Sequence, residues 1–113
     1  MSSKRILLTG CAGFIGGHIL RRLLAENADV VGVDNFSTGR RENLSGLERD
    51  FKFIEGTLCD PEICRQAVEG VDCIIHQATI PSVPRSVNDP LASLHSSVTA
   101  TVTLLCAAKE AGV

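Results

Sequence analysis

The chain has 113 residues, a formal net charge of −2, four phenylalanines, and neither tryptophan nor tyrosine. Its length suits one domain with one core, and 44% hydrophobic against 21% charged residues argues against intrinsic disorder. It contains neither a basic block nor an apolar run of the ~18 residues that a spanning helix needs, so we expect no nucleic-acid partner and no membrane partner.

The first half of the chain predicts a strand, a helix and a second strand. A continuous apolar run over residues 5–8 is typical of a strand buried on both faces. Apolar residues at helical spacing over 15–24, with arginines on the other side, predict an amphipathic helix. A second buried strand is expected over 30–33. The polar, glycine-containing segment 36–50 predicts a loop with about one turn of helix.

The middle of the chain predicts another strand, helix and strand. Residues 51–56 alternate between apolar and polar, as a half-buried strand does. Asp60-Pro61 is a typical helix start, and the short helix that follows is expected to end at Gly70. The apolar run 71–76 predicts a fourth strand, and the two prolines in 77–89 predict a loop.

A long helix is predicted for the remainder of the chain. Asp89-Pro90 repeats the cap and first-turn proline, and Gly112 marks the expected end. An apolar stripe at helical spacing supports the prediction, and its members are Leu91, Leu94, Val98, Val102, Leu105 and Ala108.

Strands that alternate with helices predict an α/β fold. Because crossovers between parallel strands are right-handed, we expect a Rossmann-like, three-layer parallel sheet of about four strands in the order 3-2-1-4.

The segment between the first strand and the first helix carries a glycine-rich phosphate-binding pattern. Gly10 suits the tight turn after the strand, Gly13 lets backbone amides approach a pyrophosphate, and Gly16 allows close helix packing. The helix N-terminus then offers unpaired N–H groups and a partial positive charge. The alternative is that these glycines only shape a turn.

Asp34 follows the second strand, 18 residues beyond Gly16. A carboxylate at this place accepts the hydroxyls of an adenosine ribose and repels a 2′-phosphate, which favours NAD over NADP. The alternatives are that Asp34 caps a turn, and that Arg40 and Arg41 receive a 2′-phosphate instead of being solvated loop charges.

The five cysteines indicate a reducing compartment. Their number is odd and their spacings match no zinc pattern, so we expect small buried thiols in the cytoplasm and no metal site.

Three segments resemble one known family. TGCAGFIGGH (residues 9–18) resembles the TGxxGFIGSH opening of the extended short-chain dehydrogenase/reductase family. VDNFSTGRRENL (33–44) is similar to the segment after the second strand in NAD-dependent nucleotide-sugar epimerases and dehydratases. HQATIPSVPRSVNDP (76–90) resembles the HQAAxPSVPRSxxDP segment of UDP-glucose and UDP-N-acetylglucosamine 4-epimerases, which is the most specific of the three.

The resemblance implies NAD as cofactor and a set of residues around it. The implied cofactor-binding residues are Gly10, Gly13, Phe14, Ile15 and Gly16 at the pyrophosphate, Asp34, Asn35, Ser37, Thr38 and Gly39 around the ribose, Thr57 and Leu58 beside the adenine, and Gln77, Ala78 and Thr79 along the nicotinamide half. It also implies that Ser82, Arg85 and Ser86 face a sugar nucleotide, with a solvated loop cation as the alternative for Arg85.

The chain departs from the family pattern at a few positions. Thr57 stands where the family usually has an Asp that accepts from the adenine amino group, so adenine binding is expected to be weaker. Ser97 and Ala100 replace an Asn and a Gly common in the long helix. Cys11 lies in the phosphate loop, either as a small filler or as a thiol mildly activated by the helix N-terminus.

The family reaction is a reversible hydride transfer at C4 of a UDP-sugar, and it uses a Tyr-x-x-x-Lys pair. The chain holds no tyrosine. We therefore expect residues 1–113 to be the N-terminal half of the NAD-binding domain, truncated before the substrate domain, with no catalytic residue and no activity alone. A UDP-sugar is expected only in a full-length context. The alternatives are the dehydratase or decarboxylase branch, a non-catalytic dinucleotide-binding or sensing module, and a structural fragment.

The fourth strand would have an open, apolar edge in such a half-domain. We therefore expect a homodimer that covers either this edge or the long C-terminal helix.

Overall fold

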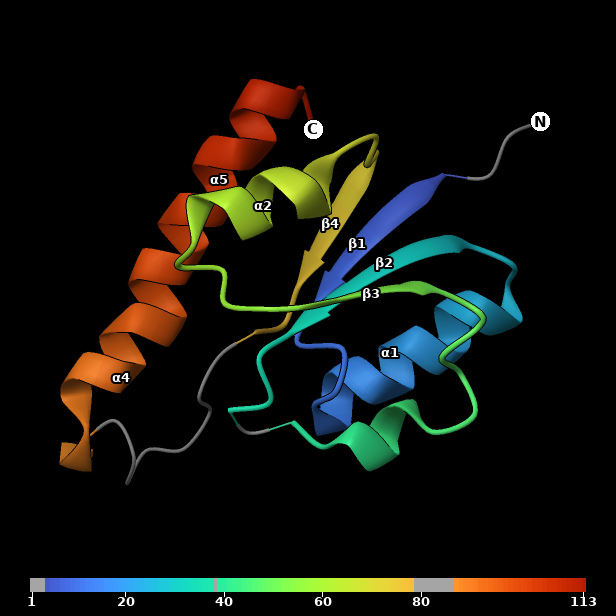
Figure 1. Cartoon of the computed structure of the whole chain (residues 1–113), viewed down its shortest axis with the longest axis horizontal. Coiled ribbons are helices and arrows are strands. Elements are labelled where there is room, and N and C mark those ends of the chain that lie inside the picture. The colour runs from blue at the N-terminus through green and yellow to red at the C-terminus, as the bar shows by residue number, and fades with distance from the viewer. Residues whose placement is uncertain (1–3, 38, 79–86) are drawn as a thin grey trace.

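Three apolar runs and one alternating segment of the sequence form the strands of one parallel sheet. The computed structural model describes residues 4–37, 39–78 and 87–113. Its strands are β1 (Arg5–Thr9), β2 (Asp29–Asp34), β3 (Lys52–Glu55) and β4 (Cys73–His76). They pair in the order β3-β2-β1-β4 and every pair is parallel, which confirms the predicted order (Figure 1).

Each central strand buries both of its faces. Leu7 pairs with Val31, and both side chains belong to the core on one side of the sheet, whereas Leu8 and Val30 belong to the core on the other side. Because successive side chains of a strand alternate between faces, a sheet covered twice requires apolar residues at every position. This explains why the strands appear in the sequence as unbroken apolar runs.

Helices cover both faces of the sheet, which makes three layers (Figure 1). Helix α1 (Phe14–Ala25) and the 3-10 turn η1 (Arg41–Leu44) lie on one face, and η1 is the expected single turn in the loop 36–50. Helix α2 (Pro61–Val68) and helix α5 (Ala100–Ala111) lie on the other. Helix α2 starts as predicted, because the Asp60 side chain accepts from the Glu62 N–H at 2.9 Å.

The predicted long helix is interrupted by a π-helical segment. The whole helix consists of α4 (Pro90–Leu94), the π-helical segment η2 (His95–Thr99) and α5. It ends at Gly112, which has the left-handed conformation. The predicted apolar stripe faces outward except for Ala108, and the buried face of α5 is Ala100, Leu104, Ala107 and Ala108. Helix α5 is thus apolar on two sides, and the smaller side chains pack against α2 and the sheet.

By length and composition alone, Pro90–Ala111 is also the one run among the described residues that could cross a membrane, with a mean hydropathy of 1.4. Core helices pass the same test, and this helix packs through one face on the protein core.

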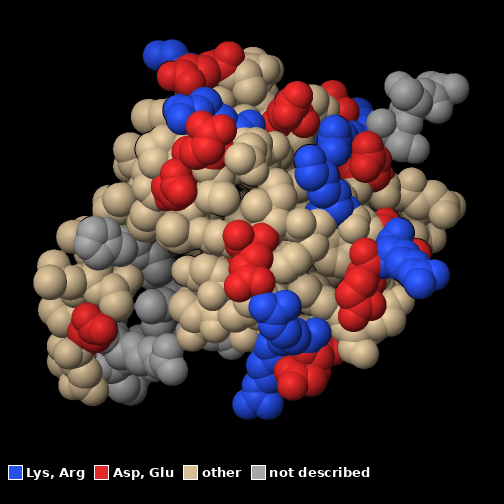
Figure 2. Space-filling model, in the orientation of Figure 1, with Lys and Arg blue, Asp and Glu red and all other residues tan. Residues whose placement is uncertain are grey.

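Acidic and basic side chains alternate over the face in Figure 2 rather than gathering by sign.

Candidate functional site

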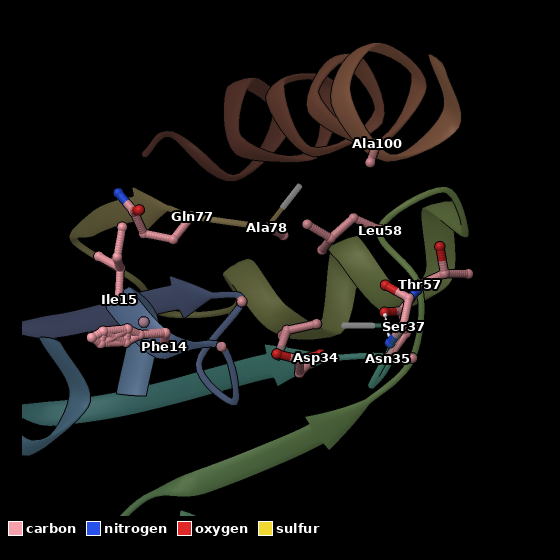
Figure 3. Close-up of a pocket in the computed structure, with 15 residues that line it drawn as sticks. Phe14, Ile15, Asp34, Asn35, Ser37, Thr57, Leu58, Gln77, Ala78 and Ala100 are labelled. Atoms are coloured by element: carbon pink, nitrogen blue, oxygen red, sulfur yellow. Dashed lines mark hydrogen bonds between the residues drawn. The ribbon is translucent and has the colours of Figure 1, made fainter. Parts of the chain in front are cut away.

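A cavity of about 330 Å³ opens at the carboxyl ends of β1, β2 and β4. The strand order changes direction there, because β2 and β4 lie on opposite sides of β1. Crevices at such switch points are where α/β sheets bind ligands. The lining residues are Gly10, Gly13, Phe14, Ile15, Gly16, Val33, Asp34, Asn35, Ser37, Gly56, Thr57, Leu58, Gln77, Ala78 and Ala100 (Figure 3).

Gly10 brings the loop after β1 close to the segment after β4. Its φ is +69°, and its N–H donates to the Val33 carbonyl at 2.8 Å. A Cβ at this position would lie 2.9 Å from the Ala78 nitrogen and 2.9 Å from the Gln77 carbonyl carbon. The left-handed backbone and the close approach both require glycine here.

Gly16 holds helix α1 against the same loop. A Cβ on Gly16 would lie 1.9 Å from the Gly10 carbonyl oxygen, so the close packing expected of this glycine is made with the loop itself. The helix begins after Gly13, which provides no side-chain cap, and its first turn holds no acidic residue. The first-turn amides of a helix have no intrahelical acceptor, so this end of α1 favours an anion.

Asp34 is 8% exposed and connects β2 to the phosphate loop. Its Oδ2 accepts from the Ala12 N–H at 2.9 Å, and its Oδ1 accepts from the Phe36 N–H at 2.7 Å. Phe36 has a φ of +58°, a left-handed conformation that is costly for an aromatic residue and that this hydrogen bond helps to hold. Asp34 therefore caps a turn and lines the cavity at the same time, and each oxygen keeps a second lone pair.

The other end of the cavity is formed by polar side chains after β2 and β3 (Figure 3). The Asn35 Oδ1 accepts from the Ser37 N–H at 3.1 Å, and the Thr57 Oγ1 accepts from the Cys59 N–H at 3.2 Å. Leu58 beside them is 4% exposed and joins the core. Thr57 retains its hydroxyl proton for donation and a further lone pair for acceptance.

Most residues implied for the cofactor share this cavity. Gly39 does not line it, because Gly39 packs against the backbone of Ala12. Thr38, Thr79, Ser82, Arg85 and Ser86 lie outside the described residues. Val33, Gly56 and Ala100 also line the cavity, although no sequence motif points to them. Val33 and Gly56 directly precede Asp34 and Thr57, so a strand-end position is the signal that points to them.

Arg41 is engaged within the protein. Its guanidinium lies 2.7 Å from the Glu55 carboxylate and 4.3 Å from the centroid of the Phe36 ring. Arg40 is exposed, and its backbone N–H donates to the Ala12 carbonyl at 3.0 Å. Both side chains of this pair are more than half exposed, so the arrangement of Arg41 favours the expected solvated loop charge over the alternative of a 2′-phosphate receiver.

Cys11 is a filler rather than an activated thiol. It is fully buried against Gly32, where a Cβ would meet its Sγ at 2.8 Å. Burial, and secondly the charge of Asp34, raise the pKa of Cys11 to about 12. The proximity to a helix N-terminus is thus outweighed by desolvation. Within the described part of the chain, no group of three or more His, Cys, Asp or Glu could hold a metal ion.

Only Cys11 and Cys64 are buried as expected, whereas Cys59 is half-buried and Cys73 and Cys106 are exposed. The buried and the exposed cysteines are expected to react with Ellman's reagent at different rates. At pH 8, Cys73 and Cys106 react fast because they are exposed. Cys11 and Cys64 react at least ~100-fold more slowly, since burial raises their pKa values to about 12 and about 11. Time-resolved absorbance with mass-spectrometric assignment measures this, and unfolding in guanidinium should make all cysteines fast. Early labelling of Cys11 in the native protein would contradict the filler assignment.

The sequence model of the NAD dependent epimerase/dehydratase family matches residues 6–113. UDP-glucose 4-epimerase of Mycolicibacterium smegmatis is 42% identical over 112 residues, which cover 96% of this chain and 36% of that protein. The chain therefore spans about a third of the length of this relative.

Solved structures of nucleotide-sugar epimerases and dehydratases superpose on this chain. UDP-glucose 4-epimerase of Thermus thermophilus in complex with NAD superposes with a TM-score of 0.86 at 36% identity, covering 96% of this chain and 35% of that one. The dTDP-glucose 4,6-dehydratase of Streptomyces venezuelae with NAD and TYD bound superposes with a TM-score of 0.90 at 35% identity, covering 96% and 37%.

Proposed function

The chain belongs to the NAD dependent epimerase/dehydratase family, and from this we propose that residues 1–113 form the dinucleotide-binding half of a nucleotide-sugar enzyme and bind NAD in the cavity described above. The observation that carries the proposal is the joint position of Asp34 and the Gly10–Gly16 turn on one cavity. Structures of family members with NAD bound support the choice of cofactor.

The cavity fits a dinucleotide in both shape and charge. The uncapped end of α1 suits the pyrophosphate, and Asp34 retains lone pairs for the two ribose hydroxyls. In this proposal the adenosine end is received by Asn35, Ser37, Thr57 and Leu58, and the nicotinamide half lies along Gln77 and Ala78. All six residues line the cavity (Figure 3). When bound, NAD supplies a hydride acceptor at the nicotinamide ring.

The enzyme branch that we favour is the UDP-sugar 4-epimerase branch. A 4-epimerase relative reaches 42% identity, and the segment 76–90 resembles the 4-epimerase pattern most closely. A sugar-nucleotide dehydratase is the second candidate, since such an enzyme superposes with a TM-score of 0.90. We place Ser82, Arg85 and Ser86 at the sugar nucleotide in a full-length context. Because the 113 residues include no tyrosine, we propose no turnover by this chain alone.

Isothermal titration calorimetry of the 113-residue protein with NAD tests the proposal. We expect saturable binding of one NAD per chain, and at least tenfold weaker binding of NADP because Asp34 repels its 2′-phosphate. An absence of heat and of NMR shift changes with NAD would leave only the structural-fragment alternative. Conversion of UDP-glucose to UDP-galactose by this chain alone would refute the absence of turnover.

Replacing Thr57 with Asp is expected to strengthen NAD binding about fivefold. A carboxylate accepts more strongly than a hydroxyl, by about 1 kcal/mol when a neutral donor such as the adenine amino group is bound. Calorimetry measures the gain, and Thr57→Asn is the matched control because it has the shape of Asp without the charge. Equal affinities of the two variants would mean that Thr57 does not face the adenine.

We also propose that two copies of the chain associate through the long helix. Five large apolar side chains lie on the outer side of α4, η2 and α5, at 46–68% exposure, and they are Leu91, Leu94, Val98, Val102 and Leu105. An apolar surface of this kind marks an interaction site, and a two-fold dimer covers it with its own copy. The edge of β4 is the alternative, but β4 is only four residues long.

Sedimentation velocity tests this dimer. Leu105→Glu is expected to give a monomer because it places a charge in the apolar stripe, whereas Glu110→Gln, an exposed change on the same helix that points away from the stripe, leaves the dimer intact. A wild-type monomer at high concentration would refute the dimer, and a dimer that survives Leu105→Glu would favour the β4 edge.

We further propose a cytoplasmic location, supported by the reduced thiols of Cys11, Cys64, Cys73 and Cys106. Recovery of the protein from a periplasmic, secreted or membrane fraction would contradict it.

A further inference from the structure

His76 is a half-buried imidazole that the dinucleotide site, as proposed, does not use. It ends β4, and both of its ring nitrogens have partners. Nδ1 lies 2.6 Å from the Thr9 Oγ1 at the end of β1, and Nε2 lies 2.8 Å from the Thr101 Oγ1 in α5. The ring therefore bridges the centre of the sheet and the helix that covers it.

The hydrogen bonds around the ring determine its tautomer. The Thr9 Oγ1 accepts from the Gln77 N–H at 2.9 Å and from the Ala78 N–H at 3.1 Å. A hydroxyl has two lone pairs and one proton, so its proton is left for the Nδ1 of His76. Nδ1 is thus the acceptor, and the ring proton is on Nε2.

The other side of the ring is consistent with this assignment. The Thr101 hydroxyl donates to the Ser97 carbonyl at 2.8 Å, which leaves its lone pairs for the Nε2–H of His76. These hydrogen bonds form one series that runs from the Gln77 and Ala78 amides to the Ser97 carbonyl, and every donor in it points in the same direction. The neutral Nε2–H imidazole gives each of these donors an acceptor.

The two backbone amides that donate to Thr9, those of Gln77 and Ala78, belong to the wall of the cavity. Gln77 and Ala78 both line it, and they approach Gly10 so closely that a Cβ there would lie 2.9 Å from the Ala78 nitrogen. The Gln77 N–H also donates to the Thr9 backbone carbonyl at 3.3 Å, so the Thr9 hydroxyl is a second support for Gln77, and it is the acceptor of the Ala78 N–H. The orientation of that hydroxyl depends on His76.

A proton on Nδ1 is incompatible with this arrangement. It would face the Thr9 hydroxyl proton, and Thr9 would have to give up one of the two amides to accept it. The groups that face the ring from β1 and α5 are the uncharged hydroxyls of Thr9 and Thr101. Burial alone lowers the pKa of His76 below its ordinary 6.5. The ionisable residues of the elements packed against the ring do not cause this lowering, and they are Arg5, Cys73, Cys106, Lys109 and Glu110.

We propose that His76 is a positioning residue of the cofactor cavity: as the neutral Nε2–H tautomer it ties Thr9 to Thr101 and lets the Thr9 hydroxyl accept from both the Gln77 and the Ala78 amide, and protonation of its ring makes this hydroxyl give up one of them. Since the folded state prefers the neutral ring, the holding effect is complete above pH 6.5 and is lost as the pH falls below it. Its effect on NAD rests on the proposed function; the tautomer does not.

NMR of the full chain without NAD tests the tautomer directly. We expect the ¹⁵N resonance of the His76 Nδ1 at the unprotonated, pyridine-like position and that of Nε2 at the protonated, pyrrole-like position. On lowering the pH, the ring should titrate in one step below 6.5, and the Gln77 and Ala78 amide signals should shift in the same step. A protonated Nδ1 in the neutral ring, or a titration without movement of these amides, would overturn the proposal.

Matched variants and NAD affinity test the positioning role. Thr101→Val removes the acceptor of Nε2–H and should raise the NAD dissociation constant about tenfold, whereas Thr101→Ser keeps the hydroxyl and should stay within about twofold. In the wild type, the constant should rise by up to about tenfold for each pH unit below the His76 step.

His76→Gln cannot titrate, so its weaker affinity should lose that pH dependence, whereas the exposed His18→Gln should keep it. An unchanged pH dependence in His76→Gln would overturn the proposal. If no variant and no wild type binds NAD, the proposed function fails while the NMR titration still decides on His76.

Discussion

Replacing Gly16 with Ala is expected to destabilise the protein by on the order of 3 kcal/mol or more and to remove measurable NAD binding. The new methyl group would lie 1.9 Å from the Gly10 carbonyl oxygen and 2.8 Å from its carbon. These are backbone atoms of a turn that is itself packed against Gln77 and Ala78, so they cannot give way locally. Helix α1 would have to move off the loop, and overpacking of this kind costs about 1–3 kcal/mol or more.

The control for this prediction is the next residue, Gly17. A Cβ there would meet nothing closer than the Asn43 Cβ at 3.6 Å, which is ordinary contact. Gly17→Ala lies in the same helix and should be neutral or stabilising by up to about 1 kcal/mol, because alanine favours the helix. The pair therefore separates a helix-propensity effect from a clash with the loop.

Urea unfolding followed by far-UV circular dichroism measures both variants, since the chain has no tryptophan or tyrosine to report by fluorescence. The midpoint of Gly16→Ala should fall by more than about 1 M relative to wild type. Equal midpoints for Gly16→Ala and Gly17→Ala would show that α1 can be displaced from the loop at little cost.

The layered fold could be predicted because its signals are local. Strands β1, β2 and β4 are apolar runs bounded by glycine or a polar residue, and β3 alternates between polar and apolar residues. Helix α2 starts at Asp60-Pro61 as its cap and proline require. The buried side of the last helix could not be predicted in the same way. Residues such as Leu105 and Leu104 are equally apolar, yet one is 61% exposed and the other 2%, because tertiary packing selects the face. The π-helical segment has no local signal either.

In the candidate site, too, features with a local sequence signal could be predicted, whereas features set by tertiary packing could not. Gly10, Gly16 and Asp34 were identifiable because a phosphate-binding turn and a ribose acceptor occupy fixed places relative to the first two strands. The bridge from Thr9 through His76 to Thr101 joins residues 67 and 25 positions apart. Nothing in a linear pattern indicates that these side chains meet, so only the packed structure reveals it.

Replacing Asp34 with Asn is expected to cost about 2 kcal/mol of stability and to weaken NAD binding at least tenfold. The carboxylate now accepts from two backbone amides, Ala12 and Phe36, through separate oxygens. An asparagine has the same shape but only one acceptor oxygen, and its NH₂ group would face one of these N–H groups. A buried amide without an acceptor costs about 1–3 kcal/mol, and Phe36 would lose support for its left-handed backbone.

The effect on ligand choice separates a binding role from a purely structural one. If Asp34 accepts the ribose hydroxyls, Asp34→Asn removes both that acceptor and the repulsion of a 2′-phosphate, so the preference for NAD over NADP should shrink as well as the affinity for NAD. If Asp34 only holds the loop, both ligands should weaken equally. Calorimetry with the two dinucleotides measures the ratio.

The matched control is Asp29→Asn at the other end of the same strand. The Asp29 side chain is 58% exposed and forms an ion pair with the Arg5 Nε at 3.8 Å, a surface pair worth less than about 1 kcal/mol. This variant should keep the wild-type unfolding midpoint and both dissociation constants. A loss of stability in Asp29→Asn equal to that in Asp34→Asn would assign the effect to the charge of β2 rather than to the two amides that Asp34 holds.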